Sequence, residues 1–428
     1  MGSVTEVELS EDRILRVIGP AKIDVVTGRV LAVGSKFSAG SSLVVHKFRS
    51  YGIKILTHSK LKITLGEGAR VEEARSGEEV VDEWLRIVEY ILKKCLGKLC
   101  KVLIVGPPES GKSTFTVFLA NYFREVGVRV GVVDGDIGQE DVLIPTTVAL
   151  TEVSKPVLWL RELEPLIFRF VGCISPQYCY SESILAIREL VDEAIELGFK
   201  AIVVNTDGWV GTTSGIEHKL TIIRWVKPDL VVVTDREVFN YLSRCVSNLV
   251  EVIYAPKPAV VRERSRDERR ELRAQAYRRY FSRGKVRRVK LSEVGLLNIR
   301  ALAGRVLTLD ELKELLKIPD SDLNKIVFSS RFGDTIFIIT EEFIDTAVSH
   351  DERKIVAINL RDLRGAIVGL MGERLSDVGI GLILGVDLNS QEVITLTPWD
   401  GPIRGLVLGR VKLGEDFEEV GGMSKCIL

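Results

Sequence analysis

Residues 1 to about 75 carry short apolar runs, several of them alternating with polar positions, and glycine or serine separates one run from the next. Runs of about four to eight residues with this pattern are typical of β-strands, and their close spacing favours an antiparallel sandwich or barrel. The predicted strands are Ile14–Ile18, Ala21–Val26, Arg29–Val33, Ser42–Val45, Lys54–Leu56 and Lys62–Leu65. The pattern predicts a β-rich N-terminal domain over residues 1–77.

The periodicity changes after this segment. From Glu78 to Cys95, apolar residues recur every three or four positions, as on one face of an amphipathic helix. Beyond Lys101, short continuous apolar strands alternate with helical stretches. The predicted strands are Val102–Val105, Val128–Val133, Phe199–Asn205 and Leu230–Thr234, and the predicted helices are 112–126, 183–197 and 217–226. Continuous strands between helices indicate a parallel sheet covered on both faces, so an α/β domain is predicted over residues 78–290.

From about Leu291 the pattern is mixed again. A short helix is predicted at Leu309–Leu316, and several strands follow it. These strands are 325–328, 335–339, 354–359, 381–387, 392–397 and 405–411. Residues 291–428 are therefore predicted to form a C-terminal, mainly β domain, and the predicted fold class is α/β with β-rich flanks.

The composition agrees with several folded domains. At about 150 residues per domain, 428 residues give two or three. The chain has 59 basic and 59 acidic residues, so its overall charge gives no argument for a nucleic-acid partner. The longest apolar runs are strand-sized and no signal peptide is visible, so we expect no membrane association and a cytoplasmic location. Few glutamines beside many charged residues is a bias of hyperthermophiles.

The cysteines indicate no zinc site, because none of the six forms a Cys-x-x-Cys pair and the four histidines are scattered. Cys95 could pair with Cys100, and Cys173 could pair with Cys179. Free buried thiols are the expectation for a cytosolic chain.

A phosphate-binding loop stands between a predicted strand and a predicted helix, the context that makes this motif specific. It fits G-x-x-x-x-G-K-[ST], and the nucleotide-binding candidates are Gly106, Pro107, Pro108, Glu109, Ser110, Gly111, Lys112, Ser113 and Thr114. Glycines let backbone N–H groups turn toward phosphate oxygens, and the helix points its positive end at them. Lys112 is predicted to contact the β- and γ-phosphates of ATP and Ser113 to ligate Mg²⁺.

Two features argue against other P-loop classes. Partitioning ATPases carry a lysine directly after the first glycine, where this chain has Pro107. The guanine-reading motif N-K-x-D is missing after the late strand, which Asp235 and Arg236 follow. Guanine specificity is therefore not expected.

Two aspartates, Asp134 and Asp136, end the second strand of the α/β domain. Carboxylates at the C-terminal end of a parallel strand face the ligand crevice. One of them could join the Mg²⁺ shell or accept a proton from an attacking hydroxyl. We assign both roles to Asp136, although a polar Asp-Gly-Asp loop tip is the structural alternative.

The order and spacing of the motifs resemble the polynucleotide 5′-hydroxyl kinase family. The motifs are the phosphate loop, the Asp136-x-Gly138-Gln139 segment, Asn205–Trp209 and an arginine-rich run. That family includes archaeal RNA kinases, the kinase subunit of the pre-mRNA cleavage machinery and kinases of ribosomal-RNA processing. The resemblance covers about residues 102–281, whereas the flanks resemble the family's β-rich domains in placement only. In the family, the N-terminal domain helps to hold the adenine.

The resemblance implies an RNA-binding role for three residues. A tryptophan at a strand exit, such as Trp209, is more often part of the core. The matching family residue stacks on nucleotides near the 5′ end, and stacking suits an enzyme that accepts many sequences. Ser175-Pro176 resembles the family's Thr-Pro element, which clasps the RNA, with serine in place of threonine. Gln139 is a further candidate for the acceptor strand.

The arginine-rich run extends from Arg262 to Lys290 and holds eleven Arg and two Lys against four acidic residues. Part of it must be a solvated helix with Glu–Arg pairs one turn apart. Its start resembles the family's lid, in which two arginines five apart close over the transferred phosphate. Those arginines correspond to Arg264 and Arg269, and a register shift would replace them by Arg262, Arg266 or Arg270. An inserted arginine stabilises the charge of the phosphoryl transition state.

These interpretations converge on an ATP- and Mg²⁺-dependent kinase of RNA 5′-hydroxyl ends, with DNA left open as a second acceptor. The predicted catalytic residues are Lys112, Asp136, Arg264 and Arg269. One alternative is an ATP-binding, non-catalytic scaffold subunit of an RNA-processing complex. Another is a small-molecule kinase or a nucleotide switch. The sequence does not predict the oligomeric state.

Overall fold

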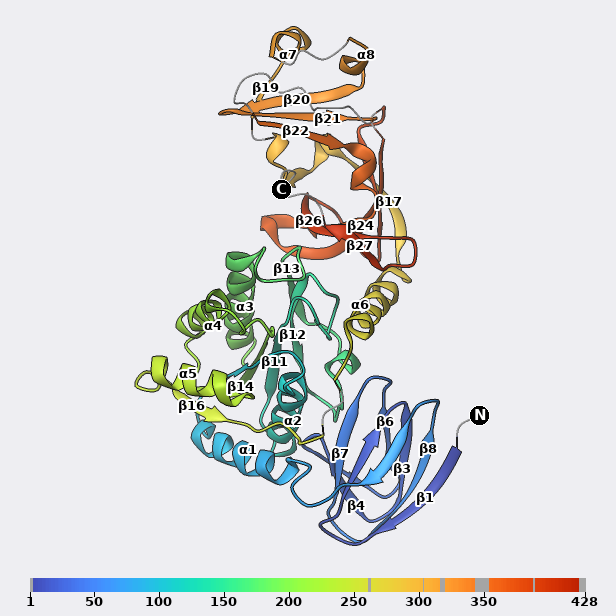
Figure 1. Cartoon of the computed structure of the whole chain (residues 1–428), viewed down its shortest axis with the longest axis vertical. Coiled ribbons are helices and arrows are strands. Elements are labelled where there is room, and N and C mark those ends of the chain that lie inside the picture. Colours follow the sequence, from blue (N-terminus) through green and yellow to red (C-terminus); the bar gives the residue numbers. More distant parts are fainter. Residues whose placement is uncertain are drawn as a thin grey trace. The chain divides into compact units, whose positions relative to one another are not determined.

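The computed structural model describes residues 3–260, 263–302, 304–315, 320–342, 354–387 and 389–422 (Figure 1). The chain forms two compact units. The first is Met1–Val171 with Ser175–Arg269, and the second is Gly172–Ile174 with Arg270–Leu428. The division into three domains expected from sequence stays a prediction.

Two antiparallel sheets form the N-terminal part of the first unit, drawn in blue in Figure 1. The first sheet has the order β1-β8-β3-β6 and the second β5-β4-β7-β2-β9. Their bounds are β1 (Ser3–Leu9), β2 (Ile14–Ile18), β3 (Ala21–Thr27), β4 (Arg29–Ala32), β5 (Ser35–Ser38), β6 (Ser42–Val45), β7 (Ser50–Ile55), β8 (Ser59–Leu65) and β9 (Arg70–Glu73). The predicted β-rich segment is confirmed. The strands missing from the prediction, β1, β5 and β9, are mainly exposed and polar, so no apolar run marks them.

The central sheet of the first unit has seven strands in the order β13-β12-β11-β14-β10-β15-β16. These are β10 (Cys100–Val105), β11 (Val130–Gly135), β12 (Thr147–Glu152), β13 (Ile167–Phe170), β14 (Ala201–Thr206), β15 (Leu230–Val233) and β16 (Glu251–Tyr254). Strands β11, β14, β10, β15 and β16 are parallel to one another, and β12 and β13 add an antiparallel edge. The residues of β10, β11, β14 and β15 are almost all buried, as their continuous apolar sequences predict.

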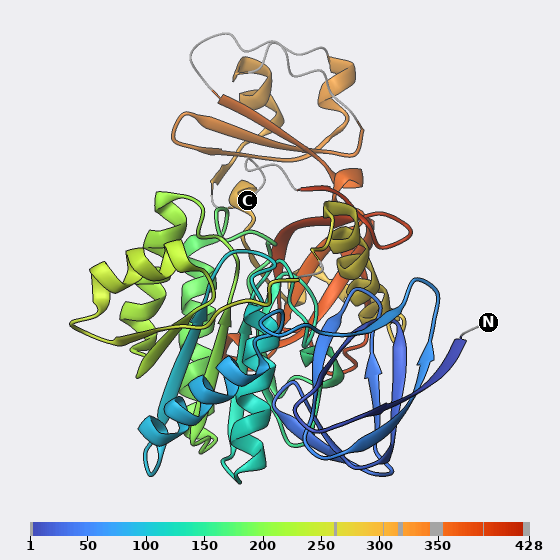
Figure 2. The same cartoon turned by 60° about the horizontal axis from the view of Figure 1, so that its bottom comes forward.

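Helices cover both faces of this sheet (Figure 2). They are α1 (Val81–Cys95), α2 (Lys112–Glu125), α3 (Tyr180–Glu196), α4 (Thr213–Val226) and α5 (Arg236–Val246). The crossover through α2 leads from β10 to β11, whereas those through α4 and α5 lead across the sheet in the opposite direction. Because such crossovers are right-handed, α2 lies on one face and α4 and α5 lie on the other.

Polar contacts join the second N-terminal sheet to helix α2 and to the segment that follows β12. Asn121 of α2 donates to the backbone carbonyls of Val33 and Val157, each over 2.7 Å. The Tyr51 hydroxyl donates to the carbonyl of Leu158 over 2.7 Å. Both side chains are buried, so each hydrogen bond satisfies polar groups that water does not reach.

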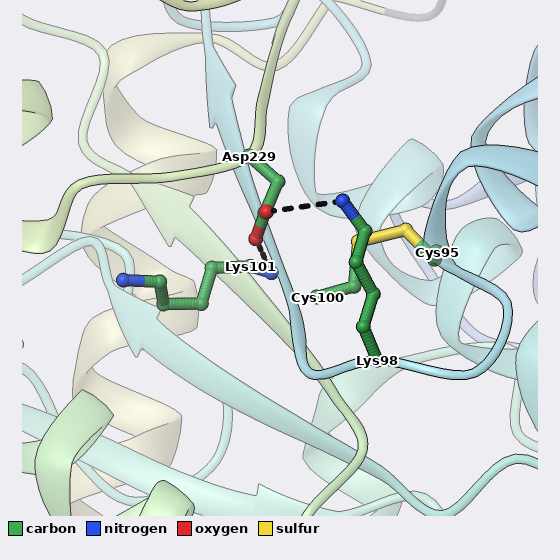
Figure 3. The surroundings of a disulfide bond; sticks show 5 residues. All are labelled: Cys95, Lys98, Cys100, Lys101 and Asp229. Carbon is green, nitrogen blue, oxygen red and sulfur yellow. Dashed lines mark hydrogen bonds and ion pairs between the residues drawn. A yellow bond between two sulfur atoms is a disulfide. The ribbon is translucent and has the colours of Figure 1, made fainter.

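A disulfide joins the last residue of α1, Cys95, to the first residue of β10, Cys100 (Figure 3). The expectation of free thiols is therefore wrong for this pair. Nearby, Asp229 accepts a hydrogen bond from the backbone N–H of Lys101 over 2.9 Å and forms an ion pair with Lys98 at 3.5 Å. The chain is thus held closely at the start of the strand that leads into the phosphate loop.

The second unit is mainly β, as predicted. Its larger sheet has the order β17-β25-β24-β23-β26-β18, with β27 paired to β26, and its smaller sheet has the order β19-β20-β21-β22. Their bounds are β17 (Lys285–Lys290), β18 (Gly295–Leu297), β19 (Arg305–Val306), β20 (Ile326–Phe332), β21 (Thr335–Thr340), β22 (Lys354–Asn359), β23 (Ala366–Met371), β24 (Asp377–Asp387), β25 (Glu392–Thr397), β26 (Gly405–Leu413) and β27 (Glu419–Gly422). The predicted helix is α7 (Leu309–Leu315), whereas Leu316 lies outside the described residues. A second helix, α8 (Asp320–Leu323), follows.

The arginine-rich run begins before helix α6 (Arg266–Phe281) and continues into β17. Within the second unit, Arg273 forms an ion pair with Glu419 at 2.7 Å, and Arg278 donates to the carbonyl of Asp416 over 2.9 Å. This part of the run is the ion-paired helix that the sequence allows. None of the helices in the described parts of the chain is long and apolar enough to cross a membrane.

Candidate functional site

The carboxyl ends of three neighbouring parallel strands bring the predicted site together. Strand β14 lies between β10 and β11, and Asn205 is paired in register with Ile104 on one side and with Asp134 on the other. The phosphate loop follows β10, Asp136 follows β11, and Trp209 follows β14. Since parallel strands all end at the same edge, the three segments meet there.

The phosphate loop holds its shape through its own polar groups. Ser110 Oγ donates to the carbonyl of Pro107 over 2.8 Å and lies 2.6 Å from the Thr234 hydroxyl. Gly111 has φ of 89°, a left-handed conformation that suits glycine, and α2 begins at the next residue. The first backbone N–H groups of α2 have no partner within the helix, so its N-terminus can bind an anion.

Lys112 is buried, and its Nζ donates to the carbonyl of Pro107 over 2.7 Å. Burial lowers the pKa of Lys112, and the nearby carboxylates of Asp136 and Asp207 oppose that change. The ammonium group is therefore surrounded by carboxylates on one side and by the phosphate loop on the other.

Asp134 is completely buried and held by several N–H groups. Its Oδ1 accepts from Asn205 Nδ2 over 2.8 Å, and its Oδ2 accepts from the backbone of Asp141 over 3.0 Å. Burial and the charge of Asp141 raise the pKa of Asp134 to about 7. Asn205 Nδ2 also lies 3.4 Å from Ser113 Oγ, so this amide links the acidic strand end to the phosphate loop. From sequence alone Asn205 received no role, and its place at the end of a buried strand was the available signal.

Asp136 lies farther out and is partly exposed. Its Oδ1 accepts from the backbone N–H groups of Gly138 and Gln139, over 3.3 and 3.0 Å. Although part of the residue reaches the surface, desolvation of the carboxylate, opposed by Lys112, raises the pKa of Asp136 to about 6. Of the two aspartates, Asp136 is the more accessible, and it is ionised at neutral pH.

Asp207 supports the backbone of Trp209. Its Oδ1 accepts from the Trp209 N–H over 2.8 Å, and its Oδ2 forms an ion pair with the fully buried Lys219. Burial opposes ionisation, but the charge of Lys219 outweighs it and holds the pKa of Asp207 below its ordinary value. No role was predicted for either residue of this pair.

Trp209 is a partly exposed residue, and its ring lies against two other rings. Tyr180, the first residue of α3, approaches it edge-on at 6.5 Å, and His218 lies at 5.7 Å. Burial lowers the pKa of His218 to about 4, so this imidazole is neutral.

The other two predicted RNA-binding residues are Ser175 and Gln139. Ser175 is partly buried and lies in the turn before α3, and Gln139 Nε2 donates to the carbonyl of Gly138. The shared role of Ser175 and Trp209 in RNA binding stays a prediction.

The two predicted lid arginines lie on the phosphate loop. Arg264 Nε lies 3.0 and 3.1 Å from the two carboxylate oxygens of Glu109. Arg269 Nη1 lies 3.9 Å from the same carboxylate. The alternative Arg266 is exposed, Arg270 donates to the carbonyl of Glu419, and Arg262 lies outside the described residues.

Oxygen groups at this edge suit a hard cation with few protein ligands. The candidates are Ser113 Oγ and Asp136 Oδ2, which accepts no hydrogen bond from the residues that the structure describes. In that same part of the chain, no three acidic, histidine or cysteine side chains are arranged to hold a metal by themselves. Mg²⁺ commonly takes one or two protein oxygens and completes its shell with phosphates and water, so the site fits it.

A phosphate loop, a carboxylate at the end of a strand of the same sheet and arginines beside the loop define a P-loop nucleotide-binding protein of the phosphotransferase kind. Residues 106–283 match the family described as mRNA cleavage and polyadenylation factor CLP1 P-loop. The polyribonucleotide 5′-hydroxyl-kinase of Pyrococcus furiosus is 30% identical over 343 residues, which cover 78% of this chain and 94% of that protein. The polyribonucleotide 5′-hydroxyl-kinase of Methanocaldococcus jannaschii is 27% identical over 332 residues, covering 76% and 90%.

The chain therefore belongs to the polyribonucleotide 5′-hydroxyl-kinase family. A CLP1 homolog of Culex quinquefasciatus is 34% identical over 191 residues, which cover 42% of this chain and 45% of that protein. The solved structure of a wild-type Clp1p–Pcf11p complex superposes with a TM-score of 0.67, covering 96% of this chain and 98% of that one. At 14% identity this match shows a shared fold, and it confirms the predicted fold class.

Proposed function

We propose that this chain is an ATP-dependent polynucleotide 5′-hydroxyl kinase, which transfers the γ-phosphate of ATP to the 5′-hydroxyl of RNA. The observation that carries the proposal is the meeting of three groups at one strand edge. These are the phosphate loop with Lys112, the partly exposed carboxylate of Asp136, and the lid arginines on Glu109. Phosphoryl transfer needs little more than positioning and charge stabilisation, and these groups supply both.

The phosphate loop would bind the nucleotide. Backbone N–H groups of residues 109–111 and of the start of α2 would donate to phosphate oxygens, and Lys112 would add a positive charge. Ser113 and Asp136 would hold Mg²⁺, with the Thr114 hydroxyl as a further candidate ligand next to Ser113. When bound, Mg²⁺ neutralises charge on the β- and γ-phosphates.

Asp136 is proposed as the general base. With a pKa of about 6 its carboxylate is ionised at neutral pH and can accept the proton of the 5′-hydroxyl as the oxygen attacks phosphorus. Its hydrogen bonds to the backbone of Gly138 and Gln139 fix its orientation. Asp134 is too enclosed for this role, since N–H groups occupy both of its oxygens.

Arg264 and Arg269 are proposed to stabilise the charge that spreads over the transferred phosphoryl group. Trp209, Ser175 and Gln139 are proposed to hold the acceptor strand. Trp209 presents a π-face to whichever base comes near it, a mode of binding that tolerates many sequences. The proposal leaves DNA with a 5′-hydroxyl end open as a second acceptor, because none of these groups would need to contact a 2′-hydroxyl.

The test is to follow label from γ-labelled ATP and Mg²⁺ into RNA, into a matched DNA or into free phosphate, at ordinary and at elevated temperature. The proposal predicts label on RNA with a 5′-hydroxyl end, lost in Lys112→Ala, and the DNA lane sets the acceptor range. Label released only as free phosphate would favour a nucleotide switch. Bound ATP with no transfer at any temperature would favour a non-catalytic scaffold.

A further inference from the structure

Glu109 occupies a backbone position that disfavours it. Its φ is 58°, in the left-handed region, where a residue with a Cβ costs roughly 1–2 kcal/mol compared with glycine. The chain nevertheless has a long acidic side chain here, inside a loop that must bind negatively charged phosphates. A carboxylate in this place repels the ligand unless a cation neutralises it, so the side chain needs a separate explanation.

The partners of Glu109 supply that explanation. Both of its carboxylate oxygens lie within 3.1 Å of Arg264 Nε, and Arg269 Nη1 lies 3.9 Å from one of them. The Glu109 and Arg264 side chains are mainly buried, with 15% and 16% of their surface exposed. The two arginines carry two positive charges against the one negative charge of Glu109, so the net charge of this group of side chains is positive.

The contact with Glu109 leaves most N–H donors of Arg264 available to bind a phosphate. A guanidinium has five N–H donors in one plane, and Glu109 engages Arg264 through the single Nε–H. The terminal nitrogens of Arg264 donate no hydrogen bond to the residues that the structure describes. A carboxylate bound at Nε fixes the plane of the guanidinium, and the four terminal N–H groups remain for a phosphoryl oxygen.

We propose that Glu109 is a positioning residue, which anchors the lid on the phosphate loop and orients Arg264 and Arg269 toward the transferred phosphate. The catalytic part of this inference rests on the proposed kinase function. The contact that anchors the lid is independent of that function. Glu109 acts through the arginines and does not touch the reacting atoms.

Steady-state kinetics of three variants test the catalytic consequence. Glu109→Gln keeps the size and removes the charge, and Glu109→Gly also relieves the backbone strain and guards against misfolding. Both should lower kcat by about 10- to 100-fold, since misplaced catalytic groups cost rate, with KM for ATP within about threefold. Glu109→Asp keeps the charge and should retain more activity than Glu109→Gln.

A double variant separates positioning from a direct effect on the nucleotide. If Glu109 acts through Arg264, adding Glu109→Gln to Arg264→Ala should lower kcat little further. Fully additive losses would overturn the proposal. An unchanged or higher kcat in Glu109→Gln would also overturn the proposal. A higher kcat would mean that the Glu109 carboxylate competes with phosphate for the arginines and slows the wild type.

Limited digestion of the full-length chain with trypsin, without substrates, tests the anchor independently of any activity. Cleavage after Arg264 and Arg266 should be several times faster in Glu109→Gln than in the wild type. Glu263→Gln is the matched control, because Glu263 is an exposed acid of the same segment. Equal digestion rates in all three proteins would overturn the anchor. If the wild type had no kinase activity but Glu109→Gln were still cleaved faster, the anchoring contact would stand and the proposed function would be rejected.

Discussion

The amide of Asn205 donates a hydrogen bond over 2.8 Å to the buried carboxylate of Asp134 on the neighbouring strand. The two residues are paired in register between β14 and β11, so the sheet itself brings them together. The same amide lies 3.4 Å from the Ser113 hydroxyl. The phosphate loop and the acidic strand end are therefore connected through one side chain, and Asp136 projects beyond this connection.

The burial of Asp134 predicts a pH-dependent stability. Its folded pKa of about 7 lies above the ordinary value of 3.8, so the fold favours the protonated form. This contribution is fully present below about pH 4 and is lost as the pH rises through about 7, at up to about 1.4 kcal/mol per pH unit. The side chain introduced by Asp134→Asn carries no charge at any of these pH values. Thermal unfolding at several pH values should show the variant gaining stability relative to the wild type as the pH rises, and a constant difference would contradict this.

Asp136 should control the pH dependence of the rate. Because a general base works when deprotonated, and the pKa of Asp136 is about 6, kcat/KM for RNA should rise with pH up to about 6 and then level off. Asp136→Asn should remove this limb and lower turnover by at least about 100-fold. ATP affinity should change far less. A parallel loss of ATP affinity, measured by titration, would reject Asp136 as the general base and leave it only its role in holding Mg²⁺.

Trp209 should matter for the acceptor and not for ATP. Loss of one base–aromatic stack costs about 1–3 kcal/mol, so Trp209→Ala should raise KM for RNA by roughly 5- to 150-fold. Trp225→Ala is the matched control, because Trp225 lies on α4 and is 53% exposed. Equal KM values for the two variants would place Trp209 in the core, as its type and position alone would suggest.

The Cys95–Cys100 disulfide should add to stability. It closes a short loop of sequence separation 5, for which loop-closure entropy gives about 2 kcal/mol. Unfolding by denaturant should show this loss on reduction or in a Cys95→Ser, Cys100→Ser variant. Cys245→Ser, which removes an exposed free thiol, should change nothing. A wild type indifferent to reductant would mean that the bond contributes nothing to folding.

Local patterns predicted much of this molecule. The phosphate loop and the helix after it lie within one motif, and the apolar runs located many of the buried strands of both units. The buried strands β12 and β23 were not predicted. Contacts between distant segments were beyond such patterns. Glu109 and Arg264 are 155 residues apart, and the pairing of Asn205 with Asp134 depends on the strand order, which no local pattern specifies.

The arginine-rich run shows the same limit. Its composition agreed equally with a lid and with an ion-paired helix, and the structure contains both. Arg264 and Arg269 reach the phosphate loop, whereas Arg273 pairs with Glu419 in the second unit. Only the partners distinguish these arginines, and the partners lie far away in the sequence.

The most direct test of the central claim compares two RNAs of one sequence, one with a 5′-hydroxyl and one with a 5′-phosphate, as acceptors of label from γ-labelled ATP. The account predicts labelling of the 5′-hydroxyl RNA alone, abolished by Lys112→Ala. After digestion to nucleosides and nucleotides, the label should be on the 5′ oxygen of the first residue. Equal labelling of both RNAs, or none of either from a chain that binds ATP, would contradict it.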